Sequence, residues 1–255
     1  MRLVSYNILD GGLGRADPIA EILQAQHADV ITLLEADDPA VVDRLARRLK
    51  MDFIHSHGNG HACAILSRFA IRETVNHAAL SVGISNTFTL ATIAAPAGGQ
   101  WHVGAVHLKA HATLEAERQR VRELSEILAR LKPLRDARTP HVLAGDFNAN
   151  SPVQKIEKDK CKPRTRKQWD DNGGMLPREV VQVLLDAGYV DSLNAVRKEA
   201  AGMMGTFSTH FPGQRVDYIF THGFDAGGIT DAWIETDRLA TYASDHYPIG
   251  AELQW

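Results

Sequence analysis

The sequence lacks several features that define whole classes of protein. It has two cysteines, Cys63 and Cys161, in 255 residues, which is typical of a cytosolic protein with reduced thiols, although a single disulfide is also permitted. No apolar run approaches the roughly 20 residues of a membrane-spanning helix. The first residues, MRLVSYNILDGG, lack the apolar core of a signal peptide. We therefore expect a cytoplasmic protein without a membrane span.

The sequence also lacks an excess of basic residues. It has 28 Lys and Arg against 31 Asp and Glu, a net charge of -3 and a pI of about 6.5. Dedicated nucleic-acid-binding proteins are usually basic, so any nucleic acid would have to be bound by a local patch. A hydrophobic content of 44% and a charged content of 23% exclude a disordered, collagenous or coiled-coil chain.

Short apolar runs alternate with stretches of helical period, which predicts an α/β fold with many strands. Strands are predicted at residues 2–9, 29–36, 62–68, 86–95, 101–108, 141–148, 215–222 and 247–253. Helices are predicted to begin at Asp17 and Asp38, each an N-cap residue followed by proline. Two more are predicted at about residues 113–131 and 177–187, the second ending at Gly188.

One change of composition interrupts this pattern. No proline- or serine-rich linker divides the chain, so we expect a single domain over residues 1–255. A polar segment at about residues 153–175, basic in its first part, is predicted to be a long surface loop inserted after the strand HVLAGDFNAN. Its cations and Trp169 could contact a nucleic-acid backbone. Its acidic residues dilute that charge, so a merely solvated loop is the alternative.

Polar side chains stand at the ends of the predicted strands. They are Asn7, Glu35, His107, Asp146 and Asn148, joined by Asp217, Asp245 and His246 just before or at the start of later strands. Strand ends can converge on one rim of a sheet. Several carboxylates on one rim would repel each other without a cation, and hard oxygen ligands favour magnesium, manganese or calcium over zinc. Each residue alone is more simply a cap, a turn or an ion-pair partner; their joint occurrence favours a site.

The blocks SYNIL, LLEA, AILSRF, VHL, GDFNA, RVDYIF and SDHYPI resemble, in this order, the signature of the endonuclease/exonuclease/phosphatase superfamily. The resemblance extends from Asn7 to His246 and is most specific where GDFN and SDH occur together. It implies a four-layer α/β sandwich, in which two mixed sheets pack face to face between helices. It also implies a metal-dependent phosphoesterase that uses Mg²⁺ or Mn²⁺.

The resemblance also implies a role for each strand-end residue. Asn7 and Glu35 match metal-site residues, with Glu35 the direct ligand, and Asp245 matches a further metal-site residue or a supporting acid. Asp146 and Asn148 match the pair that orients the attacking water and the phosphate. His246 matches the histidine that contacts the phosphate or acts as general base, and Asp217 the acid that orients it. His107 matches the second histidine of the deoxyribonuclease, sphingomyelinase and 5-phosphatase branches, whereas Leu9 stands where abasic-site endonucleases typically carry Asp.

The substrate is less well determined by the sequence. Arg68 and His111 are the predicted substrate-binding residues, with Lys109 and Arg118 as further phosphate handles; His61 is interpreted as a surface histidine. We expect phosphodiester hydrolysis, of DNA or RNA if the basic segment binds it. The alternative is hydrolysis of a phospholipid, an inositol phosphate or another small phosphoester. A non-catalytic binding module would be expected to lack one of the key residues, and none is lacking. A monomer is favoured.

Overall fold

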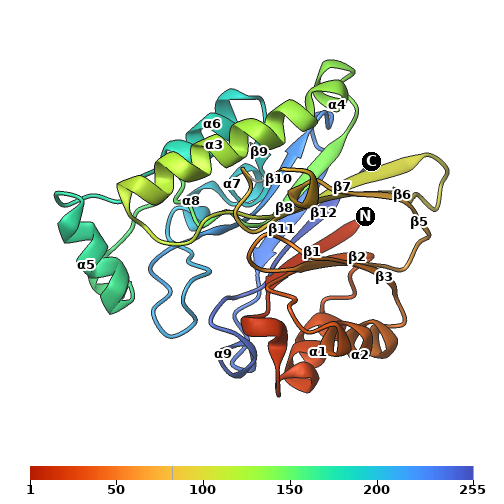
Figure 1. Ribbon diagram of the computed structural model, residues 1–255, viewed down its shortest axis with the longest axis horizontal. Helices are drawn as coiled ribbons and strands as arrows, with labels where there is room; N and C mark the ends of the chain where they lie inside the picture. Colours follow the sequence, from red (N-terminus) through yellow and green to blue (C-terminus); the bar gives the residue numbers. More distant parts are fainter. Residues whose placement is uncertain (82, 255) are drawn as a thin grey trace.

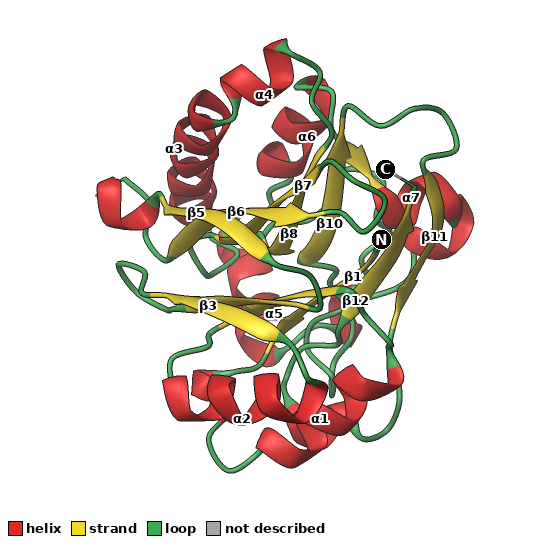
Figure 2. Ribbon diagram, turned by 90° about the vertical axis from the view of Figure 1, so that its right-hand side faces the viewer, coloured by secondary structure: helices red, strands yellow, loops and turns green. Residues whose placement is uncertain are grey.

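Two mixed six-stranded sheets form the centre of the computed structural model, which describes residues 1–81 and 83–254. They pack face to face (Figure 1, Figure 2). In spatial order, the first sheet contains β11 (Ile229–Ile234), β12 (Ile249–Leu253), β1 (Arg2–Asn7), β2 (Val30–Leu34), β4 (Cys63–Ser67) and β3 (Asp52–Ser56). The second contains β5 (Ile71–Asn76), β6 (Thr87–Ala94), β7 (Gln100–His107), β8 (His141–Asp146), β10 (Asp217–His222) and β9 (Val190–Asp191).

Helices cover the outer faces of both sheets. Helices α1 (Ala16–Ala25) and α2 (Pro39–Leu49) lie under the first sheet, and α3 (Leu114–Arg130), α4 (Lys132–Asp136) and α6 (Glu179–Asp186) lie over the second (Figure 2). The predicted four-layer α/β sandwich is therefore confirmed. The shorter helical segments are η1 (Asp10–Gly12), η2 (Ala78–Leu80), η3 (Lys158–Lys160), α5 (Pro163–Asp171), α7 (Ser192–Val196), α8 (Lys198–Ala201) and α9 (Ala240–Ala243).

Each sheet contains one parallel pair of strands near its centre. Strands β1 and β2 are parallel in the first sheet, and β7 and β8 in the second; their carboxyl ends are aligned, with Asn7 opposite Leu34 and His107 opposite Asp146. The antiparallel neighbours β4, β6, β10 and β12 begin at the same end. Residues that follow four strands and precede four others therefore meet at one rim of the sandwich.

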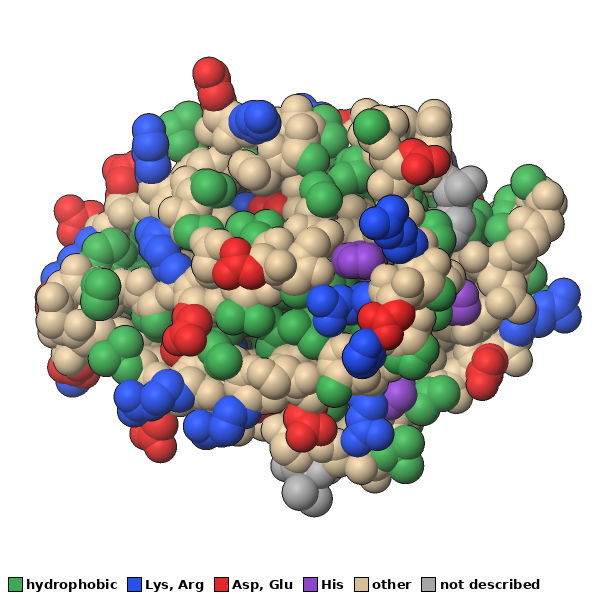
Figure 3. Space-filling view, turned by 90° about the horizontal axis from the view of Figure 1, so that it is seen from above, with side chains coloured by type: hydrophobic (Ala, Val, Ile, Leu, Met, Phe, Trp, Pro, Cys, Tyr) green, Lys and Arg blue, Asp and Glu red, His purple; other side chains and the backbone are tan. Residues whose placement is uncertain are grey.

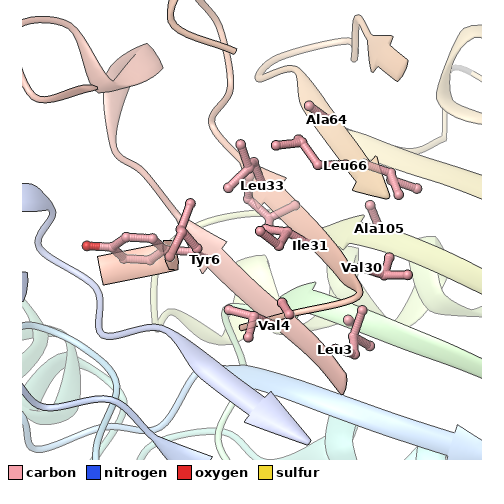
Figure 4. Close-up of a cluster of buried hydrophobic side chains, with 14 of the residues drawn as sticks. Leu3, Val4, Tyr6, Val30, Ile31, Leu33, Ala64, Leu66 and Ala105 are labelled. Atoms are coloured by element: carbon pink, nitrogen blue, oxygen red, sulfur yellow. The ribbon is translucent and has the colours of Figure 1, made fainter. Parts of the chain in front are cut away.

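Apolar side chains from both sheets fill the space between them and the helices. Strands β1, β2 and β4 contribute Leu3, Ile31 and Leu66 to one buried cluster, with Ala105 of β7 beside them (Figure 4). All five side chains of β2 are buried, because it is covered by a helix on one face and by the second sheet on the other. This core fixes the positions of the strand ends.

Most predicted elements are present, with two errors. Asp38 caps α2 by accepting hydrogen bonds from the amides of Ala40 and Val41. Asp17, however, lies in the first turn of α1 and not at its N-cap. The prediction of a long surface loop at about residues 153–175 is wrong in part, because the segment contains η3 and helix α5, which begins at Pro163.

The surface over α3, α4 and α6 carries no continuous field of one sign. Cationic and anionic side chains are interspersed on it (Figure 3). Among the helices of residues 1–81 and 83–254, none has the length and apolar character needed to cross a bilayer.

Candidate active site

The carboxyl ends of β1, β2 and β8 bring two carboxylates to one amide. Nδ2 of Asn7 donates to Glu35 Oε1 at 3.0 Å and to Asp146 Oδ2 at 3.2 Å. Asn7 and Glu35 belong to the first sheet and Asp146 to the second, so this contact joins the two sheets at the rim. Oδ1 of Asn7 accepts from the amide of Leu9 and thereby fixes the orientation of the amide group.

Two histidines flank the Asp146 carboxylate. Its Oδ2 atom lies 3.6 Å from Nε2 of His107 and 3.8 Å from Nε2 of His246. The other ring nitrogen of His246, Nδ1, is 2.9 Å from Oδ2 of Asp217. His107, Asp146, Asp217 and His246 are all buried. The predicted catalytic residues are therefore brought together, with Asp217 behind His246 and Asp146 between the two rings.

Burial and neighbouring charges raise the pKa values of Asp146 and His246 and lower that of His107. Burial, reinforced by the Asp217 carboxylate, raises the pKa of Asp146. Burial alone would lower the pKa of His246, but the carboxylates of Asp217, Asp146 and Asp245 raise it overall. Burial and the imidazoles of His61 and His246 lower the pKa of His107 to about 3. At neutral pH the site therefore combines a cationic His246 with a neutral His107.

The backbone at the strand ends adopts conformations that few residues tolerate. Gly145 has a φ of 152°, and a Cβ there would lie 1.9 Å from the carbonyl oxygen of Val106 in the parallel strand β7. Only glycine fits this close approach. Glu35 and Asn148 have φ values of 52° and 50°, in the left-handed region that is strained for such residues. These turns direct Glu35, Asp146 and Asn148 towards the same rim.

Asn148 and Asp245 complete the predicted set but differ in their surroundings. Asn148 donates its amide N–H to Asp146 Oδ1 at 2.8 Å, and its Nδ2 donates to the carbonyl of Leu108. Oδ2 of Asp245 accepts from Lys162 Nζ at 2.7 Å, and its Oδ1 lies 3.9 Å from Nε2 of His246. Among the described residues no hydrogen bond joins Asp245 to Asn7 or Glu35. Its contacts are therefore those of a second acid beside His246, not of a member of the Asn7–Glu35 pair.

The rim opens into a cleft of about 370 Å³. Its floor contains Glu35, His107, Asp146 and His246, and one wall is formed by Lys162, Arg164, Thr165 and Gln168 at the start of α5. Gln168 accepts from the amide of Ala112, and Arg164 contacts His111 at 3.1 Å. The inserted segment is thus a structured wall of the cleft.

Many cations of that segment already have anionic partners. Lys158 pairs with Asp170, Lys160 with Glu157, and Lys167 with Asp171. These pairs reduce the positive charge that the segment could present to a nucleic acid. Lys162 and Arg164 remain directed into the cleft, although Lys162 is paired with Asp245.

A buried charge network holds the loop after β7. The guanidinium of Arg120 in α3 donates to the carbonyls of Lys109 and His111 at 2.7 and 2.6 Å, and to Glu117 Oε2 at 2.7 Å. Glu123 accepts from the amide of Lys109. Arg120 and Glu123 are fully buried. The network fixes the backbone of residues 109–111, which line the cleft.

Only some of the predicted phosphate-binding residues line the cleft. His111 and Lys109 line it. Arg68 follows β4 at the opposite end of the sheet, where its Nε donates to the carbonyl of Ala28, and it is not among the residues that line the cleft. Arg118 is exposed on α3 and lies outside the cleft lining; the neighbouring Arg120 is the buried arginine.

Several residues that line the cleft were not predicted as site residues from the sequence. His61, interpreted as a surface histidine, lines it, as do Asn86, Lys162, Gln168 and Phe207. His61 and Asn86 precede β4 and β6, which run antiparallel to β2 and β7 and must begin where those strands end. Strand order would have placed them at the rim, but the sequence motifs do not give strand order.

The side chains at the Asn7–Glu35 end of the cleft fit a divalent cation. Glu35 and Asp146 supply hard oxygen atoms, and their two carboxylates converge on one neutral amide, so that a cation would offset their repulsion. Ligand atoms of Asp146, Asp217 and His246 also lie within 4.8 Å of one another. Because Asp217 and His246 already bind each other, the oxygen atoms of Glu35 and Asp146 are the better match for Mg²⁺ or Mn²⁺, with Asn7 donating to both carboxylates.

Comparison with known proteins identifies the family and the fold of the chain. The model of the Endonuclease/Exonuclease/phosphatase family matches residues 4–246. No curated protein matches the sequence. A 3′ phosphatase from Neisseria bound to a product DNA hairpin is 21% identical with a TM-score of 0.70, and an AP endonuclease from Archaeoglobus fulgidus is 18% identical with a TM-score of 0.74; both matches cover 100% of both chains. A humanized TDP2 from D. rerio is 18% identical with a TM-score of 0.70, covering 100% of this chain and 99% of that one. These structures share the fold.

Proposed function

Because the chain belongs to the Endonuclease/Exonuclease/phosphatase family, we propose that it is a divalent-metal-dependent phosphodiesterase acting on nucleic acid. The observation that carries the proposal is the position of Asp146. Its Oδ2 atom lies between two imidazole Nε2 atoms, at 3.6 and 3.8 Å, and 3.2 Å from the amide of Asn7. Such an arrangement suits attack on a phosphate, in which charge develops on several oxygen atoms at once.

The roles of the side chains follow from their contacts. Asp146 orients the attacking water and accepts its proton, since it is the carboxylate that faces both histidines. His246, held through Nδ1 by Asp217, directs Nε2 at the phosphate and donates to a non-bridging oxygen. His107 and Asn148 donate from the same side of the cleft. Glu35 and Asp146, whose carboxylates both accept from Asn7 Nδ2, would hold the divalent cation, which when bound supplies neutralisation of the phosphate and of the leaving alkoxide.

Nucleic acid is favoured as substrate by the groups around this centre. Lys109, His111 and Arg164 line the cleft beyond Asp146 and suit contact with a phosphate backbone. The Neisseria protein of the same fold is bound to a DNA product. The second candidate is hydrolysis of a phospholipid or another small phosphoester, which is favoured by the ion pairs that neutralise Lys158, Lys160 and Lys167.

Nicking of supercoiled plasmid tests the proposal. We expect nicking with Mg²⁺, none with EDTA, and a loss of roughly a hundredfold or more in His246→Ala. Glu35→Gln should need a higher Mg²⁺ concentration than the wild type for half-maximal activity, because one ligand charge is lost. Hydrolysis of bis(p-nitrophenyl) phosphate without any nicking would transfer the proposal to small phosphoesters. A folded protein inactive on both substrates, with either metal ion, would refute it.

A further inference from the structure

His61 forms a second histidine–aspartate pair on the wall of the cleft. Its Nδ1 atom is 2.7 Å from Oδ2 of Asp37, whose Oδ1 accepts from the amide of Ala62 at 2.7 Å. The amide of His61 itself points to Oδ1 of Asn86 at 3.4 Å. Because Nδ1 is engaged by Asp37, Nε2 is the ring nitrogen that remains for a ligand. The ring is half-buried and lines the cleft.

The position of this pair relative to Asp146 defines what it can reach. The His61 ring stacks on the His107 ring, with centroids 5.5 Å apart and planes inclined by 22°. His107 in turn lies 3.6 Å from Asp146. His61 is therefore one ring further from Asp146 than His107 is. A phosphate in contact with Asp146 and His246 would be adjacent to His107, which leaves His61 available to another group of the substrate.

We propose that His61, held in place by Asp37, binds a second phosphate of the substrate, adjacent to the phosphate that is cleaved. This inference rests on the proposed phosphodiesterase function and narrows its substrate class. The preferred substrate carries a further phosphate on one side of the scissile bond, either as the next diester of a strand or as a terminal phosphate. Asp37 is a positioning residue, because it acts through His61.

Charged groups of both signs lie around His61, because Lys109 lines the same cleft and the carboxylates of Asp37, Glu35 and Asp10 are close to the ring. The hydrogen bond with Asp37 raises the pKa of His61, so that the ring carries positive charge at a higher pH than an ordinary histidine. His107, stacked on it, has a lowered pKa and remains neutral. Glu35 and Asp10 lie near enough to favour the cationic form of His61.

Dinucleotides that differ in one phosphate test the inference. TpT has only the scissile phosphate, whereas pTpT and TpTp carry a second one on the 5′ or the 3′ side. For one of the last two, we expect the wild-type kcat/KM to exceed that for TpT by about tenfold, the effect of one hydrogen bond to a charged group. His61→Ala should abolish this advantage, mainly through KM, and so lower kcat/KM for the favoured substrate about tenfold more than for TpT. Asp37→Asn should reduce the advantage in part.

An oligonucleotide substrate shows whether the second phosphate that His61 binds is the next diester or a terminal phosphate. If the next diester binds, His61→Ala should lower kcat/KM for an unphosphorylated oligothymidylate and reduce the slope of log kcat/KM against log salt by about 0.7. If only a terminal phosphate binds, the loss should be confined to phosphorylated ends. His27→Ala, at an exposed histidine on the opposite end of the sheet, is the matched control. His61→Gln serves as the second variant if His61→Ala does not fold.

Three results would overturn the inference. Wild-type protein that cleaves TpT, pTpT and TpTp equally well has no second phosphate site. An equal loss on all three substrates in His61→Ala would place His61 at the scissile phosphate instead. An unchanged preference in His61→Ala would remove His61 from substrate binding. Wild-type protein that cleaves no dinucleotide or oligonucleotide, yet hydrolyses bis(p-nitrophenyl) phosphate, would be the separate failure of the proposed nucleic-acid function, and the inference would fall with it.

Discussion

Lys162 and Asp245 form an ion pair, with 2.7 Å between Nζ and Oδ2, that joins the segment inserted after β8 to the residue preceding His246. The same ammonium lies 4.2 Å from the centre of the Phe207 ring, which packs against His246 at 4.7 Å. The inserted segment is therefore connected to His246 in two ways, through the ion pair with Asp245 and through the ring of Phe207.

Removal of this lysine should affect activity more than stability. Lys162→Ala is expected to lower kcat/KM several-fold, because Asp245 and Phe207 both lose the group that positions them beside His246. The side chains are 33% and 25% exposed, so the pair contributes at most about 1 kcal/mol to folding. Steady-state kinetics and thermal unfolding measure the two effects. Lys167→Ala, which breaks an exposed pair within α5, is the control and should change neither.

Asp146 should be required for turnover but not for folding. Asp146→Asn is expected to lower kcat by roughly a hundredfold or more, because an amide cannot accept the proton of the attacking water. Burial and Asp217 raise the pKa of Asp146, which means that its ionised form is disfavoured in the folded state. The melting temperature of the variant in EDTA should therefore equal or exceed that of the wild type. A clear decrease in that temperature would contradict this account of the carboxylate.

Two arginines on one helix should differ sharply in their contribution to stability. Arg120→Met leaves Glu117 and two carbonyls without their buried donor, and should lower the free energy of unfolding by about 3–5 kcal/mol. Arg118→Met, at an exposed position two residues away, should change it by less than about 0.5 kcal/mol. Urea denaturation of the two variants measures the difference. Similar values for both would show that the network around residues 109–111 does not stabilise the fold.

A histidine far from the cleft should make the fold sensitive to acid. His141 is fully buried, with its Nε2 atom 2.7 Å from the hydroxyl of Tyr189. Burial is the main cause that lowers its pKa to about 4, against an ordinary value of 6.5. Between these pH values the unfolded chain binds a proton that the folded chain does not. The free energy of unfolding should therefore fall as the pH drops from 6.5 to 4, by about 3 kcal/mol from this residue.

Urea denaturation between pH 7.5 and 4.5 measures this dependence. His141→Gln should give a shallower decrease than the wild type, without abolishing it, because burial also lowers the pKa values of His222 and His102. His27→Ala should follow the wild-type curve. Parallel curves for His141→Gln and the wild type would mean that another group causes the loss of stability in acid.

The central strands and the polar residues at their ends could be predicted from the sequence because each polar residue directly follows or ends an apolar run. Strands β1, β2, β7 and β8 are largely buried and mostly apolar, and Asn7, Glu35, His107 and Asp146 stand out where each one ends or just beyond it. The edge strand β5 was not predicted. It is largely exposed and reads Ile-Arg-Glu-Thr-Val-Asn, which lacks a continuous apolar pattern.

Residues that reach the cleft from the inserted segment, or that stabilise it from a buried position, could not be found in this way. Lys162 and Gln168 reach the cleft only because α5 folds against the segment after β7. Arg120 lies in a helix rich in charged residues, where nothing in the sequence distinguishes it from the exposed Arg118. Asp37 could be recognised only through its hydrogen bond to His61. The position of His61 in turn depends on the order of the strands in the sheet, which the sequence motifs do not give.

The hydrogen bond between Asn7 and Asp146 spans two sheets between which residues 1–81 and 83–254 form no backbone hydrogen bond from strand to strand. Its length is therefore set by how closely the two layers pack, which depends on small side chains such as Ala105 and Ala144 between them. The geometry of the candidate catalytic centre therefore depends on that spacing. A bulkier residue in the interior, well away from the cleft, would separate the halves of the centre while each sheet kept its own structure, and catalysis would be lost before the fold.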